Sequence, residues 1–168
     1  INDSITNPGL RTYKLFKQEF GFEKYLHSIN SFKHWNSLIK LRTSTHDLNI
    51  EVGRHIDIRN RSLRNCNFCN DKIEDEIHFL LECPVYHEER ASLLHAYQIN
   101  PLSLRYLDMP TLFSNVMSSR TPRHLDALGR FAYEAFTINP NSRLGLVVQP
   151  FLILSPICYW YFLYIFLV

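Results

Sequence analysis

Three cysteines and one histidine lie within 18 residues in the spacing Cys-x2-Cys-x8-His-x4-Cys, formed by Cys66, Cys69, His78 and Cys83. Thiolate sulfur and neutral imidazole nitrogen are the donors that a tetrahedral Zn²⁺ ion takes at structural sites. A two-residue turn between two cysteines directs both sulfurs towards one ion, and the amides of that turn can hydrogen-bond the thiolates. The spacing therefore predicts a zinc site.

All four positions of this predicted site are filled by protein side chains. A closed tetrahedron has no open position for a water molecule, so the zinc is expected to be structural rather than catalytic. Two alternatives exist for the same residues. His87 stands four residues after Cys83 and could replace it as the fourth ligand, or the thiols could simply be buried without a metal.

The position of Cys83 sets a condition on the helix that carries His78. Cys83 stands five positions after His78, which is about 140° round an ideal α-helix. Cys83 can therefore reach the ion only if the helix ends there. Pro84 supplies that ending, because a proline disfavours the helical conformation in the residue before it.

Apolar residues recur at helical spacing along most of the chain, so the predicted fold class is mainly α. Several short helices are expected around one zinc-clamped β-hairpin plus helix, followed by an apolar C-terminal segment. Ser31 is the expected cap of one helix, Gly53 the expected stop of another, and Glu74 to Glu76 the acidic first turn of the His78 helix. The predicted helical stretches are 10–20, 22–29, 32–39, 45–52, 74–83, 86–97 and 125–135.

The chain of 168 residues, 46% hydrophobic and 20% charged, has the composition of a globular domain. The isolated grouping of cysteines favours a metal in a reducing compartment over a disulfide framework. Because the chain starts at Ile1 without a signal-peptide pattern, we expect a fragment of a longer product. The expected parts are a helical N-terminal part (1–53), a zinc-binding module (54–97), a helical tail (98–143) and an uncharged apolar segment (144–168).

Basic residues are concentrated before the zinc motif. Residues 1–65 hold 11 Lys and Arg against 6 Asp and Glu, whereas residues 66–90 hold 2 against 7. A basic front half suits RNA or DNA. The candidate contact residues are Arg54, His55, Arg59, Arg61 and Arg64, together with Phe68 as a stacking surface for a base. The alternatives are a solvated charged face and an aromatic ring that covers the metal.

The last 18 residues, 151–168, are almost entirely apolar. As a helix they would span about 27 Å, which is close to the hydrocarbon thickness of a bilayer. Pro156 lies in the first third of this stretch. The segment is therefore either a membrane helix or a degenerate end, and we expect the degenerate end.

Two runs of sequence resemble the zinc-binding C-terminal region of non-LTR (LINE-type) retrotransposon reverse transcriptases. One run extends from Leu41 to Arg54, and the other from Arg64 to Tyr86 with Arg90 following, including the specific segment Glu-Asp-Glu-Ile-His-Phe-Leu-Leu-Glu-Cys-Pro. The likeness covers about residues 10–90, continues weakly over 124–136 and fails after Arg143.

The resemblance implies a structural zinc module downstream of a polymerase, with Cys66, Cys69, His78 and Cys83 as ligands. Its implied partners are RNA or DNA and the missing polymerase part of the same polyprotein, in the nucleus or the cytoplasm. The fragment is not expected to be an enzyme, because it contains no Asp-Asp pair of the kind that holds a polymerase's metal ions. The alternatives are a zinc-stapled protein-docking scaffold without nucleic-acid contact and a tail-anchored membrane protein.

Overall fold

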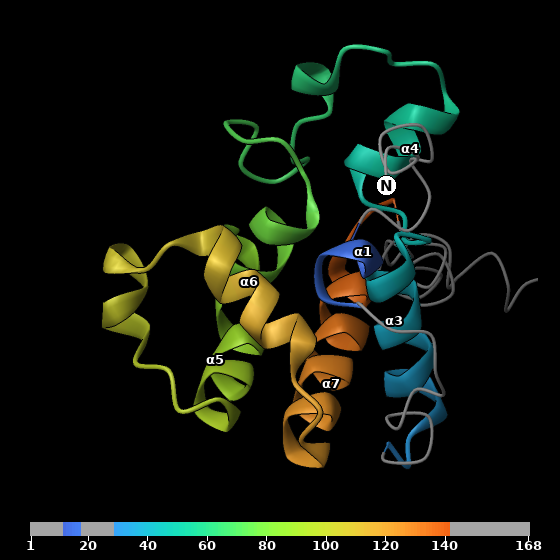
Figure 1. Ribbon diagram of the computed structural model, residues 1–168. Helices are drawn as coiled ribbons and strands as arrows, with labels where there is room; N and C mark the ends of the chain where they lie inside the picture. Colours follow the sequence, from blue (N-terminus) through green and yellow to red (C-terminus); the bar gives the residue numbers. More distant parts are fainter. Residues whose placement is uncertain (1–11, 18–28, 142–168) are drawn as a thin grey trace, which may run out of the picture.

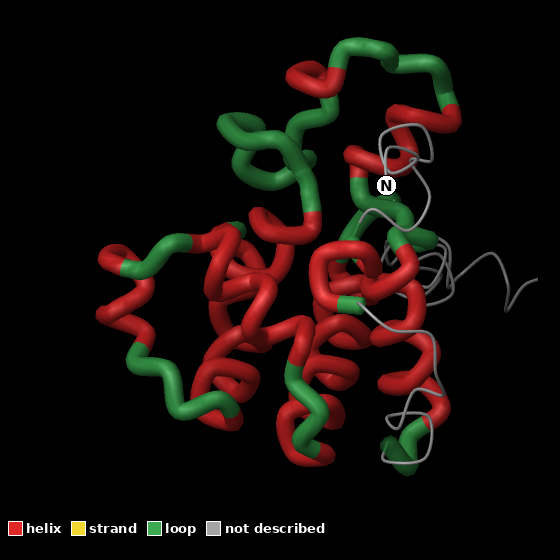
Figure 2. The backbone as a smooth tube through the Cα atoms, viewed as in Figure 1, coloured by secondary structure: helices red, strands yellow, loops and turns green. Residues whose placement is uncertain are grey.

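A computed structural model of the chain describes residues 12–17 and 29–141, and this part is mainly helical, as predicted. Figure 2 shows helices joined by loops, with no strand in the described residues. The α-helices are α1 (Tyr13–Phe16), α3 (Phe32–Thr43), α4 (Asn49–His55), α5 (His87–Ala96), α6 (Met109–Ser118) and α7 (Pro122–Ile138). Short 3-10 or π helices cover Arg61–Leu63, His78–Glu82, Pro84–Tyr86 and Pro101–Tyr106.

Helix α7 lies between α3 and α5 and packs against both (Figure 1). Its buried residues recur every three or four positions, which places them on one face, as the sequence predicted. Gly129 allows α3 to approach closely, because a Cβ atom there would lie 2.8 Å from the carbonyl oxygen of His34. The buried face of α7 consists of Leu125, Leu128, Gly129, Phe131, Ala132, Ala135 and Phe136.

The centre of the core is a group of aromatic rings around Phe79. The Phe79 ring lies 4.9 Å from the Phe136 ring, 5.0 Å from the Tyr86 ring and 5.4 Å from the Phe131 ring, measured between centroids. Phe79 and Tyr86 flank Cys83 in sequence, whereas the other two rings belong to α7. The candidate metal ligands are therefore attached directly to the main core.

Helix α4 does not stop at Gly53, so that prediction is wrong. The helix continues to His55. Gly53 serves instead as a point of close approach, because a Cβ atom on it would lie 2.7 Å from Cγ of Arg64. The other predicted cap is also only partly right: Ser31 precedes α3 but makes no side-chain capping hydrogen bond.

The predicted β-hairpin is reduced to a single antiparallel bridge between Asn65 and Ile73. The segment between them, residues 65–73, is named here the cysteine turn. Helix α6, which begins after Asp108, was not predicted from the sequence. The Asp108 carboxylate accepts a hydrogen bond from the Thr111 amide at 3.0 Å, and Pro110 stands in the first turn, where it is tolerated.

Several predictions fall on residues outside those described. They include residues 10–11 and 18–20 of the predicted helix 10–20, residues 22–28 of the predicted helix 22–29, and the whole apolar segment 144–168. Among the described residues, none of the helices combines the length and apolarity needed to cross a bilayer. The fate of residues 151–168 and the four-part division of the chain therefore stay predictions.

Candidate metal centre

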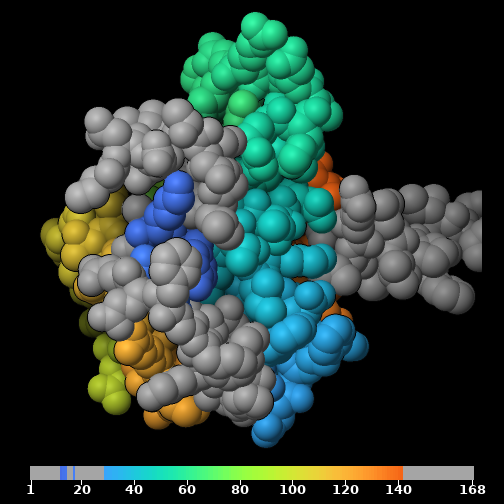
Figure 3. Space-filling view, turned by 45° about the vertical axis from the view of Figure 1, so that its right-hand side comes forward, coloured from blue at the N-terminus to red at the C-terminus, as the bar shows by residue number. Residues whose placement is uncertain are grey.

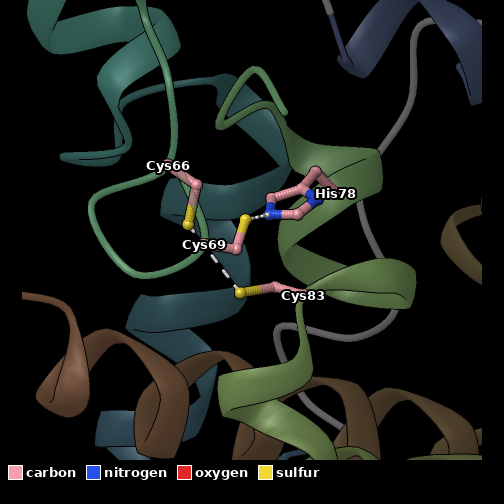
Figure 4. Close-up of side chains that lie close together, drawn as sticks. All are labelled: Cys66, Cys69, His78 and Cys83. Atoms are coloured by element: carbon pink, nitrogen blue, oxygen red, sulfur yellow. Dashed lines mark hydrogen bonds between the residues drawn. The ribbon is translucent and has the colours of Figure 1, made fainter. Parts of the chain in front are cut away.

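The four predicted ligands converge on one point. The sulfur atoms of Cys66, Cys69 and Cys83 and a ring nitrogen of His78 all lie within 4.8 Å of one another. Figure 4 shows Cys66 and Cys69 on one loop, and His78 and Cys83 at the start and the end of a helical turn. Cys66 and Cys83 are fully buried, whereas Cys69 is partly exposed.

Two of the distances between donor atoms are close to the edges of a tetrahedron around one ion, and the others are at most 4.8 Å. Cys66 Sγ lies 3.8 Å from Cys83 Sγ, and Cys69 Sγ lies 3.3 Å from His78 Nε2. Bond lengths of about 2.3 Å to sulfur and about 2.0 Å to nitrogen imply edges of roughly 3.8 Å and about 3.5 Å. A disulfide would require about 2.05 Å between the sulfurs. The donor set therefore fits a tetrahedral metal ion.

His78 and Cys83 are brought together by a π turn. Residues His78–Glu82 form a π-helix, and the Cys83 amide donates to the His78 carbonyl oxygen at 2.7 Å, a bond between residues five apart. The turn ends at Cys83, as predicted, and Pro84 begins a separate 3-10 turn. The expected α-helical geometry is wrong here, because the wider turn brings residues i and i+5 closer together round the helix axis than an α-helix does.

The cysteine turn is shaped by its own backbone. The Cys66 amide donates to the Lys72 carbonyl at 2.9 Å, and the Asn70 amide donates to the Cys66 carbonyl at 2.9 Å. Asn70 has φ 58°, in the left-handed region that asparagine adopts more readily than most residues. This compact loop turns Cys66 and Cys69 towards the same side.

Burial and amide hydrogen bonds act in opposite directions on the thiols. Burial raises the pKa of Cys66, and the backbone amides of Cys69 and Phe68, which hydrogen-bond its sulfur, partly oppose this rise. Burial likewise raises the pKa of Cys83, opposed in part by the Val85 amide. These amides already face the sulfurs that a metal ion would hold as thiolates. A bound metal cation would outweigh burial and favour the thiolate form.

His78 is suited to act as a neutral ligand. Burial lowers the pKa of its imidazole below the ordinary value. With Nε2 directed at Cys69, the second nitrogen, Nδ1, is buried and makes no hydrogen bond within the described residues. It lies 3.5 Å from Oε2 of Glu82, which also pairs with Lys72 Nζ at 3.1 Å. Glu82 is thus placed to orient the imidazole, as carboxylates commonly do for metal-bound histidine.

Arg90 of α5 holds the end of the π turn and was not singled out as a site residue. The buried guanidinium donates to the carbonyl oxygens of Cys83 at 2.7 Å, Leu80 at 2.8 Å and Phe79 at 3.4 Å. These are carbonyls of the kind that a helix end leaves without partners. Burial lowers the pKa of Arg90, while the nearby Cys83 opposes that shift. The sequence spacing between Arg90 and Cys83 did not predict this contact, because it depends on how α5 is oriented relative to the turn.

The acidic run before His78 is only partly placed as predicted, because Asp75 and Glu76 stand at the start of the helical turn and Glu74 precedes it. Glu74 is buried and accepts hydrogen bonds from the Asn49 amide at 2.7 Å and from Asn139 Nδ2 at 2.9 Å. Burial raises the pKa of Glu74, while those two hydrogen bonds oppose the rise. Asp75 caps the turn, because its Oδ1 accepts from the His78 amide at 3.0 Å.

Glu76 is also turned inward. Its Oε1 accepts a hydrogen bond from Thr12 Oγ1 at 2.7 Å and from Ser44 Oγ at 3.2 Å, and it lies 3.0 Å from His46 Nε2. All four of these residues are buried. Glu76 therefore fastens the metal-binding segment to the start of α1 and to the loop after α3, while Asp75 places its charge at the start of the helical turn.

The predicted nucleic-acid residues differ in how they are placed. Arg64 points into the protein and donates to the carbonyl oxygens of Ile50 and Ile58, each at 2.7 Å. Three arginines lie nearer the surface, each paired with an acid: Arg54 with Glu51 at 2.7 Å, Arg59 with Asp57 at 3.2 Å and Arg61 with Asp75 at 3.2 Å. Nucleic-acid contact by these residues stays a prediction.

Phe68 and His87 also have defined positions. The half-buried Phe68 ring packs edge-on against Tyr86, with 5.8 Å between centroids, so it covers the inner side of the site. His87 is exposed, its Nδ1 lies 3.2 Å from the Pro84 carbonyl, and it is not part of the four-donor group. Cys83 therefore completes the donor set, and the His87 alternative is not supported.

Comparison of the chain with models of known protein families, with curated proteins and with solved structures finds no match. The geometry of the metal centre and its surroundings is therefore the basis on which a function can be proposed.

Proposed function

We propose that this chain is a structural zinc module in which Cys66, Cys69, His78 and Cys83 hold one Zn²⁺ ion. The observation that carries the proposal is the arrangement of the four donors within 4.8 Å, with edges of 3.8 Å and 3.3 Å. Three thiolates and a neutral imidazole form a donor set typical of structural zinc. All four positions around the ion would be filled by protein, so no position would be open for water or substrate. The module is therefore proposed not to be an enzyme by itself.

The role of the ion would be to link elements that are only weakly tied to each other. The cysteine turn has one β-bridge at its base and little regular structure above it. Zinc would fasten this turn to the π turn, which Phe79 anchors to the core. Because such a site does not pre-exist in an unfolded chain, the free energy of metal binding contributes to folding.

We further propose that the module is a fragment of a non-LTR retrotransposon reverse transcriptase tail that binds RNA or DNA. The support is the resemblance of residues 41–54 and 64–90 to that family, including all four ligands, and the basic balance of residues 1–65. The buried positions of Glu74 and Glu76 remove two carboxylates from the surface that a phosphate backbone would meet.

The zinc proposal is tested by metal analysis and X-ray absorption on the purified chain. We expect one zinc per chain, bound by three sulfur atoms and one nitrogen atom. A coordination sphere of four nitrogen or oxygen donors, or the absence of stoichiometric zinc, would contradict the proposal. Binding of RNA and DNA is measured separately on the zinc-loaded protein over a range of salt concentrations, because phosphate contacts weaken steeply as salt rises.

A second candidate is a zinc-stapled scaffold that docks on the missing polymerase without touching nucleic acid. Two observations favour it. The surface arginines before the cysteine turn are each paired with a carboxylate, and the 3-10 turn Pro101–Tyr106 exposes Leu102 and Tyr106. An RNA affinity that is weak and insensitive to salt would favour this scaffold. The third candidate, a tail-anchored membrane protein, depends on residues 151–168 alone.

A further inference from the structure

A cavity of about 300 Å³ lies between α4, the 3-10 turn Arg61–Leu63 and the cysteine turn. These elements form the end of the molecule that stands away from the helical body at the top of Figures 1 and 3. One side of the cavity is polar and is made by Asn65, Asn67 and Asn70 of the cysteine turn. The lining also includes the apolar side chains of Ile56, Ile58 and Leu63.

The polar side presents carboxamide groups. Asn49 Nδ2 donates to the Asn65 carbonyl at 2.6 Å and to Asn67 Oδ1 at 3.1 Å, which holds the first part of the cysteine turn against α4. Asn65 and Asn70 are exposed and also line the cavity. A carboxamide carries a donor beside an acceptor, the pattern that matches the edge of a nucleobase.

The apolar side consists of large side chains that water surrounds in the free protein. Ile56 is 63% exposed and Leu63 is 65% exposed. The Arg64 side chain also lines the cavity. It packs against Gly53 and donates hydrogen bonds to the carbonyl oxygens of Ile50 and Ile58. A flat ring could therefore contact both the aliphatic side chains and the asparagine amides of the lining, beside an Arg64 side chain that is already ordered.

Two arginines of the segment that connects α4 with the cysteine turn, Arg59 and Arg61, are suited to contact a phosphate chain. Arg61 is mostly exposed, and its pair with Asp75 is long at 3.2 Å. Arg59 is more exposed still, and its pair with Asp57 is also 3.2 Å. Surface pairs of this kind contribute little free energy, so each arginine can exchange its carboxylate for a phosphate at small cost.

We propose that this cavity receives one unpaired nucleobase of single-stranded RNA or DNA. The inference rests on the proposed nucleic-acid function and deepens it by naming where a base is held. The volume is at the lower end of the range for ligand pockets, which suits one base and its sugar. A base inside a duplex would have to leave its stack to enter, so single strands bind more tightly than duplexes.

The experiment measures fluorescence anisotropy with the full zinc-loaded chain and four labelled probes of equal length. The probes are oligoadenylate, oligodeoxyadenylate, an abasic deoxyribose-phosphate chain and a DNA duplex. Both single strands are expected to bind at least about tenfold more tightly than the abasic chain and the duplex, because base contacts supply this difference. The tighter of the two single strands identifies RNA or DNA as the source of the base.

Two substitutions test the cavity itself. Leu63→Ser and Asn65→Ala are each expected to weaken single-strand binding by about five- to tenfold, while leaving zinc content and the melting temperature unchanged. The matched controls are Leu102→Ser, at a leucine that is 77% exposed, and Asn115→Ala on α6, and both should bind as the parent chain does. Leu63 is exposed, so its replacement does not threaten the fold.

The outcomes separate this inference from the proposed function. Tight single-strand binding that both cavity variants retain would overturn the cavity and leave nucleic-acid binding standing. Equal affinity for the abasic chain would overturn it as well, because phosphates alone would then be recognised. A zinc-loaded chain that binds none of the probes would overturn both the inference and the nucleic-acid part of the proposed function, while the zinc site would stand.

Discussion

The backbone amide of Cys83 donates to the carbonyl oxygen of His78 at 2.7 Å, which closes a π turn between two of the four candidate ligands. An α-helix would place these two side chains on different sides of its axis. A π turn brings the side chains of residues i and i+5 closer together round that axis. Such turns are rare and frequently occur at functional sites. The four-residue gap between His78 and Cys83 is thus explained by a specific local geometry.

Replacing Cys69 by Ser should remove zinc and unfold the cysteine turn, because metal binding supplies folding free energy there. The replacement is expected to lower zinc stoichiometry below one and to reduce the circular dichroism of the chain in the presence of a chelator. Cys158→Ser is the matched control, since Cys158 lies outside the motif. A Cys69→Ser chain with native circular dichroism in chelator would show that the site is not structural.

Replacing Arg90 by Leu should destabilise the protein by about 2–3 kcal/mol, because three carbonyl oxygens would lose a charged, buried donor. Arg90→Lys should restore part of this stability, since one ammonium group can reach fewer carbonyls. Chemical denaturation of the zinc-loaded chain measures the effect, with Arg130→Ala on the exposed side of α7 as control. Equal free energies of unfolding for the Arg90→Leu and control variants would contradict this role.

Removing the carboxylate of Glu82 should weaken zinc binding without unfolding the protein. Glu82→Gln leaves the His78 imidazole without its nearby charge, and changes of this kind typically cost about tenfold or more in metal affinity. Competition with a chromophoric chelator measures the affinity. Glu88→Gln, at an exposed position of α5, is the control and should bind zinc as the parent chain does. Equal affinities for both variants would mean that Glu82 does not orient the ligand.

Zinc affinity should fall as the pH is lowered through neutrality. The pKa values of Cys66, Cys69 and Cys83 are raised in the metal-free protein, in each case chiefly by burial, so protons occupy the sulfurs at neutral pH and zinc must displace them. His78 has a lowered pKa and adds to the competition only in more acidic solution. The logarithm of affinity should therefore rise by roughly three per pH unit near neutrality. An affinity independent of pH would contradict the thiolate ligands.

The arginines before the cysteine turn should separate into two classes. Replacing Arg59 and Arg61 together by Ala should lower the salt dependence of RNA binding by about 0.7 for each arginine that pairs with a phosphate, without affecting stability. Replacing Arg64 by Ala should instead destabilise the fold, because its guanidinium holds the carbonyls of Ile50 and Ile58. Anisotropy titrations and thermal melting distinguish the two. An unchanged salt dependence in the double variant would favour the docking scaffold.

Local patterns in the sequence determined the set of candidate ligands, the mainly α fold and the buried face of α7. The Cys-x2-Cys turn, the break at Pro84 and the recurrence of apolar residues at three and four positions each act over a few residues. For that reason they can be recognised without knowledge of distant contacts. The donor distances around Cys66 and His78 agree with the spacing that predicted them.

The tertiary structure alone decided how the charged residues are used. Glu76 is buried because Thr12, Ser44 and His46 satisfy it, and Arg90 is buried because the π turn offers it carbonyls. These partners are between 7 and 64 residues away in sequence. Arg64 likewise follows a path that Gly53 leaves open. A charged side chain is buried only when other groups provide the hydrogen bonds that water would otherwise make. Here those groups are distant in sequence, so no local pattern predicts the burial.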